Sequence, residues 1–261
     1  MSTRISASAS ASASASASAS TSPALPFLLL TGLSAGGLMA CGTEDQGTLV
    51  LTAYGETFIE EGIPASDVDD GWAIQFSHFR VSLADVAVGG EAISAPPSVD
   101  LTQPSSGTGQ TLGSIPVSEG EYTKARFTLS RVEVEGTATK TTTTKSFDWV
   151  FDRATQYHDC DAKTRVKANA QATFQVTVHA DHLFYDSLVS EAPQILFQPL
   201  ADADEDNDGN ITASELATRD IGSYDPGSEG GINDLWAWLN ALATTLGHAD
   251  GEGHCHATVL P

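Results

Sequence analysis

Apolar and polar residues alternate in short runs between residues 48 and 180. In the clearest run, polar residues separate the apolar positions Ala168, Ala170, Ala172, Phe174, Val176 and Val178. Alternation with a period of two places one set of side chains on each face of a β-strand. One apolar and one polar face are typical of an antiparallel sheet that buries a single side. This run therefore predicts a half-buried strand that ends near His179.

Similar runs recur along this part of the chain. They fall at residues 47–54, 72–76, 79–83, 98–103, 112–117, 125–134 and 147–151, with turn residues between most of them. The alternation of Trp72, Ile74 and Phe76 resumes one residue out of phase at Phe79, which predicts a β-bulge at Ser77–His78. A second slip precedes Val132. Seven or eight such strands predict a mainly β protein, with an antiparallel β-sandwich over residues 48–180.

The period of the pattern changes after residue 180. Residues 181–191 favour a short helix, and residues 232–246 place apolar side chains at the spacing of an amphipathic helix of about 15 residues. Trp236 and Trp238 are expected to be packing residues of that helix. Residues 181–261 are therefore predicted to form a small helical segment appended to the sandwich.

This segment contains an acidic run of twelve residues, Asp204-Glu205-Asp206-Asn207-Asp208-Gly209-Asn210-Ile211-Thr212-Ala213-Ser214-Glu215. It resembles the calcium loop of EF-hand proteins, which places ligands at positions 1, 3, 5, 7, 9 and 12 and a glycine at position 6. The resemblance implies a Ca²⁺ site formed by Asp204, Asp206, Asp208, Asn210, Thr212 and Glu215. Asn210 would offer its backbone carbonyl, and Glu215 both carboxylate oxygens. Ile211, at position 8, is expected to point into the core.

The flanking residues depart from the EF-hand pattern. Pro193 and Pro199 interrupt the expected entering helix, because proline fits the first turn of a helix but not its interior. Residues 213–219 predict only a brief exiting helix. We therefore expect a single, partly irregular EF-hand whose ion has a structural role, rather than a pair that opens on binding.

The first forty residues have the features of an export signal. Ser and Ala alternate from Ser6 to Ser20, and an apolar run follows that is too short and glycine-rich to span a membrane. The run ends in Leu38-Met39-Ala40-Cys41, which resembles the lipobox of bacterial lipoproteins. That resemblance implies a signal peptide at residues 1–40, lipidation of Cys41 and a linker at 41–47. An ordinary secreted protein, with Cys41 incidental, is the alternative.

Charge restricts the possible partners. All 34 acidic residues and 11 of the 12 Lys and Arg residues follow Cys41, so the mature chain of 221 residues has a formal net charge of −23. Such a surface repels nucleic acid and anionic lipid, and it attracts divalent cations. The membrane is therefore expected as a partner only through the lipid anchor.

Cysteines and histidines suggest two further features. An exported chain with Cys41 lipidated would pair Cys160 with Cys255, closing a loop of about 95 residues. That bond would bring His158, His254 and His256 together, and three imidazoles can hold zinc or copper. In an extended tail, however, His254 and His256 share the face opposite to Cys255, so exposed histidines around a disulfide are the alternative. His179 and His182 form a separate pair at a predicted strand-to-helix junction.

Two short elements in the sandwich resemble a known domain type. Val99-Asp100-Leu101 and the stretch Ile115-Pro116-Val117-Ser118-Glu119-Gly120-Glu121-Tyr122 resemble the "DL … V-x-x-G-x-Y" pattern of bacterial lipoprotein domains with an immunoglobulin- or prealbumin-like sandwich. This resemblance implies a fold and a place at the cell surface, but no reaction.

Catalytic motifs are missing from the sequence, which contains no G-x-S-x-G, H-E-x-x-H, phosphate loop or dinucleotide fingerprint. We therefore expect a non-catalytic, calcium-binding lipoprotein of the bacterial cell envelope, at the outer membrane or the cell surface. A copper or zinc protein that uses the histidines, and a surface adhesion or capture module, are the alternatives.

Overall fold

The structure, a computed structural model, describes residues 45–261. The predicted signal peptide, the lipidation site Cys41 and most of the 41–47 linker lie outside the described residues. The strands are β1 (Gln46–Tyr54), β2 (Ala73–Val88), β3 (Glu91–Ala92), β4 (Val99–Asp100), β5 (Gln110–Ser118), β6 (Gly120–Lys140), β7 (Thr143–Phe151), β8 (Thr155–Val166), β9 (Gln171–Val178), β10 (Asn210–Ile211), β11 (Gly247–Ala249) and β12 (His256–Val259). The helices are α1 (Glu56–Glu60), η1 (Asp181–Phe184), α2 (Gln198–Ala201), α3 (Ala213–Leu216), α4 (Leu235–Leu242) and η2 (Ala243–Thr245), where η denotes a 3₁₀ helix.

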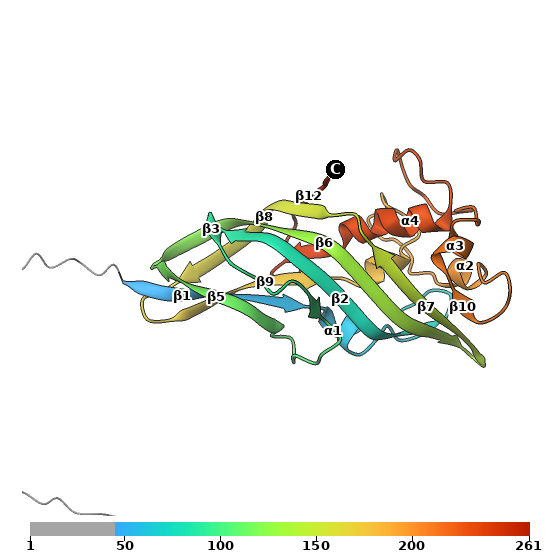
Figure 1. The fold of residues 1–261 in the computed structure, drawn as a ribbon, viewed down its shortest axis with the longest axis horizontal. Coiled ribbons are helices and arrows are strands. Elements are labelled where there is room, and N and C mark those ends of the chain that lie inside the picture. Colours follow the sequence, from blue (N-terminus) through green and yellow to red (C-terminus); the bar gives the residue numbers. More distant parts are fainter. Residues whose placement is uncertain (1–44) are drawn as a thin grey trace, which may run out of the picture. The chain divides into compact units, whose positions relative to one another are not determined.

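Two sheets make up most of this fold (Figure 1). The first has the order β11-β9-β1-β5, in which β1 runs parallel to β9 and antiparallel to β5. The second has the order β10-β7-β6-β2-β3, with β4 also paired to β2, and β8 paired to both β6 and β12. Buried residues of both sheets share one core, among them Leu49 and Phe174 of the first and Phe79 and Phe127 of the second. The prediction of a mainly β, sandwich-like fold is confirmed.

The long strand β6 connects the parts of the second sheet. Its first half pairs with β8 and its second half with β7, while β2 pairs along its other edge. The pairing of β2 with β6 shifts register between Phe76 and His78, and again between Ser82 and Leu83, where Ser130 is skipped. Both phase slips in the sequence therefore correspond to irregularities of this strand pair.

Residues 181–261 form fewer helical turns than the sequence predicts. The helix expected over 181–191 is only the 3₁₀ turn η1, because Tyr185 and Ser187 instead form β-bridges to Ile195 and Asp225. The longer helix is α4, which begins where Asp234 caps the backbone N–H of Ala237 and continues as η2. In the part of the chain from residue 45 onward, no helix is long and apolar enough to cross a membrane.

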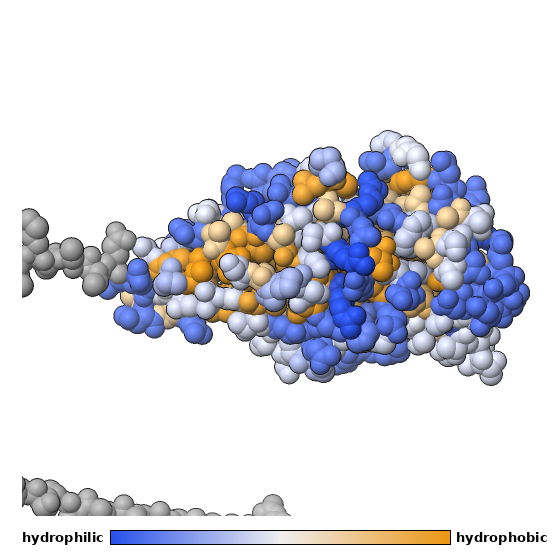
Figure 2. All heavy atoms as spheres, in the orientation of Figure 1, coloured by the Kyte–Doolittle hydropathy of each residue, from blue (hydrophilic) through white to orange (hydrophobic). Residues whose placement is uncertain are grey.

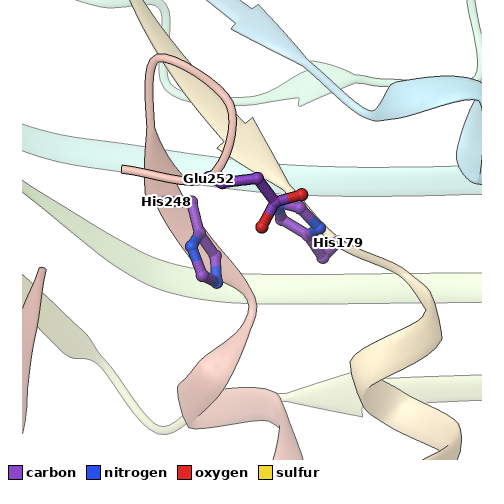
Figure 3. Close-up of side chains that lie close together, drawn as sticks. All are labelled: His179, His248 and Glu252. Atoms are coloured by element: carbon purple, nitrogen blue, oxygen red, sulfur yellow. The ribbon is translucent and has the colours of Figure 1, made fainter. Parts of the chain in front are cut away.

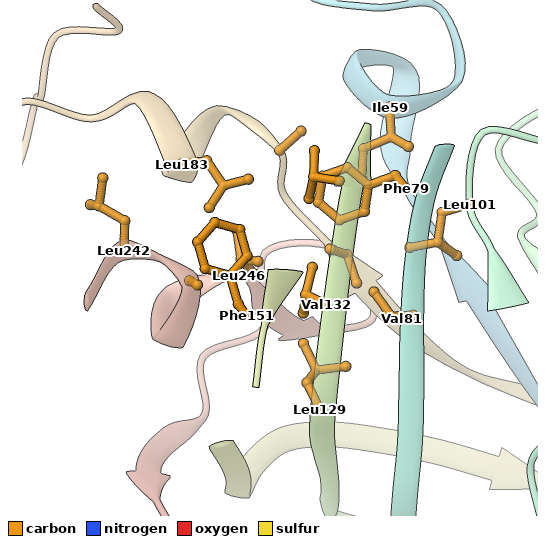
Figure 4. Packing of buried hydrophobic residues seen from close by; sticks show 14 of the residues in the cluster. Ile59, Phe79, Val81, Leu101, Leu129, Val132, Phe151, Leu183, Leu242 and Leu246 are labelled. Atoms are coloured by element: carbon orange, nitrogen blue, oxygen red, sulfur yellow. The ribbon is translucent and has the colours of Figure 1, made fainter. Parts of the chain in front are cut away.

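The C-terminal segment shares its core with the sandwich (Figure 4). Leu183, Leu242 and Leu246 pack in the same buried cluster as Phe151 of β7 and Val132 of β6. Burying each large apolar side chain contributes roughly 1.5–3 kcal/mol. Residues 181–261 consequently belong to the same compact unit as residues 48–180.

Three short strands of this segment pair with strands of the two sheets. Strand β10 pairs in parallel with β7, β11 pairs antiparallel with β9, and β12 pairs antiparallel with β8. Just before β12, the sulfur atoms of Cys255 and Cys160 lie 2.04 Å apart, which is a disulfide distance. The predicted cysteine pair therefore ties the chain's end to β8.

We expect the double variant Cys160→Ser/Cys255→Ser to be less stable than the wild type. The bond closes a loop of 95 residues, and in the chain-entropy model a loop of this length contributes about 4 kcal/mol through the unfolded state. Urea unfolding of the purified protein measures the difference. The control is Cys41→Ser, which leaves the pair intact, and equal midpoints for the two variants would show that the pair is not bonded in solution.

Candidate metal centres

The predicted calcium loop lies against β7 at the edge of the second sheet. The backbone N–H of Ser146 donates a hydrogen bond to the carbonyl of Gly209 (2.8 Å), and the indole N–H of Trp149 donates to the carbonyl of Ile211 (2.9 Å). Ile211 is fully buried, which confirms its expected orientation. The middle of the loop is thus attached to the sandwich by backbone pairing, a buried indole and an apolar side chain.

Hydrogen bonds between side chains and backbone shape the first half of the loop. Asp204 Oδ2 accepts from the N–H of Gly209 (3.0 Å), Asp206 Oδ1 from Asp208 (3.1 Å), and Asp208 Oδ1 from Asn210 (2.7 Å). Gly209 has a φ of +89°, a conformation that residues with a Cβ rarely adopt. This turn folds the chain back so that the carboxylates of its two ends approach each other.

Glu215 closes the loop from the other end. Thr212 caps α3, and its backbone N–H and hydroxyl both donate to Glu215 Oε2, at 2.9 Å and 2.7 Å. The N–H of Glu205 donates to Glu215 Oε1 (3.1 Å). The bonds from Thr212, with that from Glu205, hold the pKa of the Glu215 carboxyl below its usual value. Glu215 is therefore an anion that is fixed beside the start of the loop.

Asp204 is the buried member of the group. Its side chain is fully buried, and its Oδ2 accepts a hydrogen bond from the ammonium of Lys145, which is itself only 15% exposed. The bonds from Lys145 and from Gly209 lower the pKa of Asp204. Its second oxygen, Oδ1, is buried and accepts no hydrogen bond from any residue in the range 45–261. Because a buried carboxylate oxygen without a partner is costly, a ligand at this atom would be stabilising.

Three of the six predicted ligands converge. One carboxylate oxygen from each of Asp204, Asp206 and Glu215 lies within 4.8 Å of the other two. The other predicted ligands, Asp208, Asn210 and Thr212, belong to the same loop and make the contacts described above. Hydrophilic residues gather over this end of the molecule, where α2, α3 and β10 lie (Figure 2). Asp206 is exposed and Glu215 is half-buried, so a cation could approach this group from their side.

The histidines predicted around the disulfide divide into two neighbourhoods. His158 and His256 lie opposite each other on β8 and β12, with ring centroids 5.8 Å apart. The ring of His254 instead lies 6.4 Å from that of His248. Among the described residues, the groups whose possible ligand atoms all lie within 4.8 Å of one another do not include these three predicted ligands together.

A different group of histidines does come together. His179 follows β9, His182 lies on η1 and His248 lies on β11. Their ring centroids are 4.4 Å apart for His179 and His248, 5.2 Å for His179 and His182, and 5.3 Å for His182 and His248. Burial, together with the neighbouring histidines, lowers the pKa of His248 to about 4, and burial lowers that of His182. These two imidazoles are consequently neutral near pH 7.

Pairing between β9 and β11 creates this group. Gly247 lies opposite Val178, and the N–H of His179 donates to the carbonyl of Leu246 (3.0 Å). The sequence shows His179 and His182 as a pair, but it places His248 only in the tail near Cys255. Without knowledge of the strand pairing, no spacing in the sequence links His248 to the other two.

Comparison with protein-family models, with curated proteins and with solved structures found no match. The case for either centre therefore comes from the geometry and chemistry of its own residues.

We expect Lys145→Met to destabilise the protein strongly when calcium is removed with EDTA. The substitution leaves the buried carboxylate of Asp204 without its positive partner, and breaking a buried ion pair from one side costs ~3–5 kcal/mol. Urea unfolding compares this variant with Lys163→Met, which removes an exposed lysine of β8. Equal stabilities of the two variants would show that Asp204 is hydrated rather than buried.

Proposed function

We propose that this chain is a non-catalytic, calcium-binding lipoprotein of the bacterial cell envelope and that its calcium is structural. The observation that carries the proposal is the buried Oδ1 of Asp204, which has no hydrogen-bond donor in the described part of the chain. One carboxylate oxygen of this residue also lies within 4.8 Å of one from Asp206 and one from Glu215. An oxygen in this position would be satisfied by a cation. The spacing of the ligands along the loop gives independent support.

The chemistry of the loop favours calcium over other ions. Its candidate ligands are all oxygens, supplied by carboxylates, a hydroxyl and a carbonyl, and calcium binds six to eight such ligands at ~2.3–2.6 Å in variable geometry. Magnesium demands a tighter octahedron and keeps several waters. The loop carries five carboxylates, and Lys145 compensates one of them, so a divalent ion would offset much of the remaining repulsion.

A bound ion would hold the C-terminal segment on the sandwich. The loop contacts β7 in its middle, and α3, which begins within the last residues of the loop, packs against α4. Arg219, just after α3, accepts a backbone hydrogen bond from Leu235 at the start of α4. Calcium that joins the two ends of the loop would therefore stabilise the position of both helices through binding to the folded state alone.

Lipid attachment at Cys41 completes the proposed role. The lipobox-like residues 38–41 and the signal-like sequence before them support export and anchoring. The disulfide-distance pair Cys160–Cys255 fits an oxidising compartment outside the cytoplasm. Because the strongly negative chain would be repelled by anionic lipid, the lipid chains rather than surface attraction would hold it at the membrane.

We expect millimolar calcium to raise the midpoint of thermal unfolding. Calcium at ten times its dissociation constant contributes about 1.4 kcal/mol, which corresponds to roughly 3–6 °C for a domain of this size. Glu215→Gln should lose most of this increase, because it removes a charged ligand. The matched control Glu205→Gln removes the same charge from loop position 2, where no side-chain ligand is expected. This variant should retain the calcium-dependent increase in unfolding midpoint.

Two results would contradict the proposal. One is an unfolding midpoint that does not differ between calcium and EDTA in the wild type. The other is an equal calcium response in Glu215→Gln and Glu205→Gln, which would show that only the loop's overall charge matters. Magnesium at the same concentration distinguishes specific binding from general screening, and it should produce a clearly smaller increase.

Lys145→Met provides a further test of the same site. In this variant, calcium would be the only cation available to the buried Asp204. We therefore expect calcium to raise its unfolding midpoint by more than it raises that of the wild type, and calcium titration followed by calorimetry should show tighter binding. A smaller calcium response in the variant would place the ion away from Asp204.

A further inference from the structure

Three histidines and three carboxylates gather where β11 pairs with the end of β9. Figure 3 shows His248 on β11, Glu252 on the turn that follows it, and His179 just beyond β9, with the Glu252 carboxylate directed toward the His179 ring. Asp181 and His182 belong to η1, and Glu56 belongs to α1. The proposed calcium loop is a separate segment, at residues 204–215, and shares none of these side chains.

His179 is buried and has a free ring nitrogen. Its Nδ1 lies 3.4 Å from Glu56 Oε2, whereas its Nε2 is buried and has no hydrogen-bond partner within residues 45–261. A buried imidazole that serves only for packing normally satisfies both nitrogens. Metal-binding histidines typically contact a carboxylate through one nitrogen and the ion through the other. His179 has the carboxylate contact at Nδ1 and leaves Nε2 without a partner in the described residues.

Glu56, which makes this contact, also has an unusual backbone conformation. Its φ is +54°, which is uncommon for a residue with a side chain. Strained backbone of this kind persists where the surrounding structure enforces it, and it often occurs at functional sites. Glu56 is therefore a candidate for orienting His179.

The other two histidines also have a nitrogen available. His182 Nδ1 lies 2.9 Å from the backbone carbonyl of Thr245, and since a carbonyl only accepts, Nδ1 carries the proton and Nε2 holds the lone pair. Nδ1 of His248 is buried and has no partner among the described residues. Asp181 is held by the hydroxyl of Tyr185, which donates to its Oδ2 (2.6 Å). Three imidazoles, each with a ring nitrogen that could bind an ion, thus lie among three carboxylates.

We propose that His179, His248 and Glu252 bind one divalent transition-metal ion, Zn²⁺ or Cu²⁺, with His182 as a fourth ligand and Glu56 as the residue that positions His179. One ligand atom from each of the first three residues lies within 4.8 Å of the other two, and the same holds for His179, Asp181 and His182. In a tetrahedral zinc site, nitrogen ligands at ~2.0–2.1 Å lie about 3.3 Å from each other. Small side-chain rotations would bring the candidate ligand atoms, which now lie within 4.8 Å of one another, to this shorter separation.

The donor set distinguishes this centre from the calcium loop. Imidazole nitrogens suit zinc and copper, whereas calcium prefers oxygen alone. Glu252 is exposed, which gives an ion a path to the buried His179. The pair of half-buried His158 and exposed His256 has no comparable buried nitrogen without a partner, so it is the natural control.

Competition with a chromophoric chelator, using the purified full-length protein with Zn²⁺ and with Cu²⁺ separately, tests the proposal. We expect one ion per chain by elemental mass spectrometry, and at least 100-fold weaker binding in His248→Gln and in Glu252→Gln. His256→Gln should bind as the wild type does. Glu56→Gln should bind roughly 10–100-fold more weakly, as is typical when the partner of a metal-bound histidine is removed. Glu215→Gln should leave zinc and copper binding unchanged, which separates this centre from the calcium site.

Circular dichroism checks that each variant is folded, and Glu252→Gln is the decisive one because its side chain is exposed. Wild-type affinity in folded Glu252→Gln and His248→Gln would overturn the proposal. A loss of binding in His256→Gln alone would also overturn it, because the ion would then lie at the surface pair. With Cu²⁺, electron paramagnetic resonance should show coupling to at least two nitrogens, and a purely oxygen-coordinated spectrum would exclude the histidines.

Discussion

Unpaired strand edges impose the constraint on which the arrangement of residues 45–261 depends. Each edge presents backbone N–H and C=O groups that need partners, and long exposed edges invite association with other chains. Here the C-terminal segment supplies a short strand to each of three strands: β10 to β7, β11 to β9 and β12 to β8. The C-terminal segment contains little regular helix and yet shares its core with the sandwich. Its three strand pairings explain how it is attached there.

Each of these pairings also brings two polar side chains from distant parts of the chain close together. The β10–β7 pairing places Asp204 beside Lys145, the β11–β9 pairing places His248 beside His179, and the β12–β8 pairing places His256 opposite His158. An edge suits such groups because one side of the pair packs on the core while the other remains open to solvent. Both proposed ions therefore lie where distant parts of the chain are joined, and each would add a cross-link to backbone pairing that already exists.

The features that sequence could predict are those carried by large apolar side chains at regular spacing. Strand β9 and the bulge at Ser77–His78 follow directly from that pattern, and so does the burial of Ile211. The same pattern does not predict strand β8, because most of its buried positions hold small or polar residues, among them Thr155, Cys160, Ala162 and Thr164. The grouping of residues around His179 could not be predicted for another reason. It depends on β11, and strands of two or three residues, such as β10 and β11, are too short to show a period in the sequence. Local sequence can thus suggest a candidate site built on one loop, but not one that depends on pairing between distant segments.

The contact between Lys145 and Asp204 limits how strongly calcium would act. The ammonium occupies one oxygen of the buried carboxylate, and Oδ1 is left for a second cation. That second cation would be repelled by the lysine at short range, and in a poorly solvated position this repulsion is only partly screened. The affinity should therefore fall toward the ~10⁻⁴–10⁻³ M range of extracellular calcium modules, where the ion is normally abundant. An ion bound in that range suits a structural role better than a signalling one, because its occupancy would stay nearly constant outside the cell.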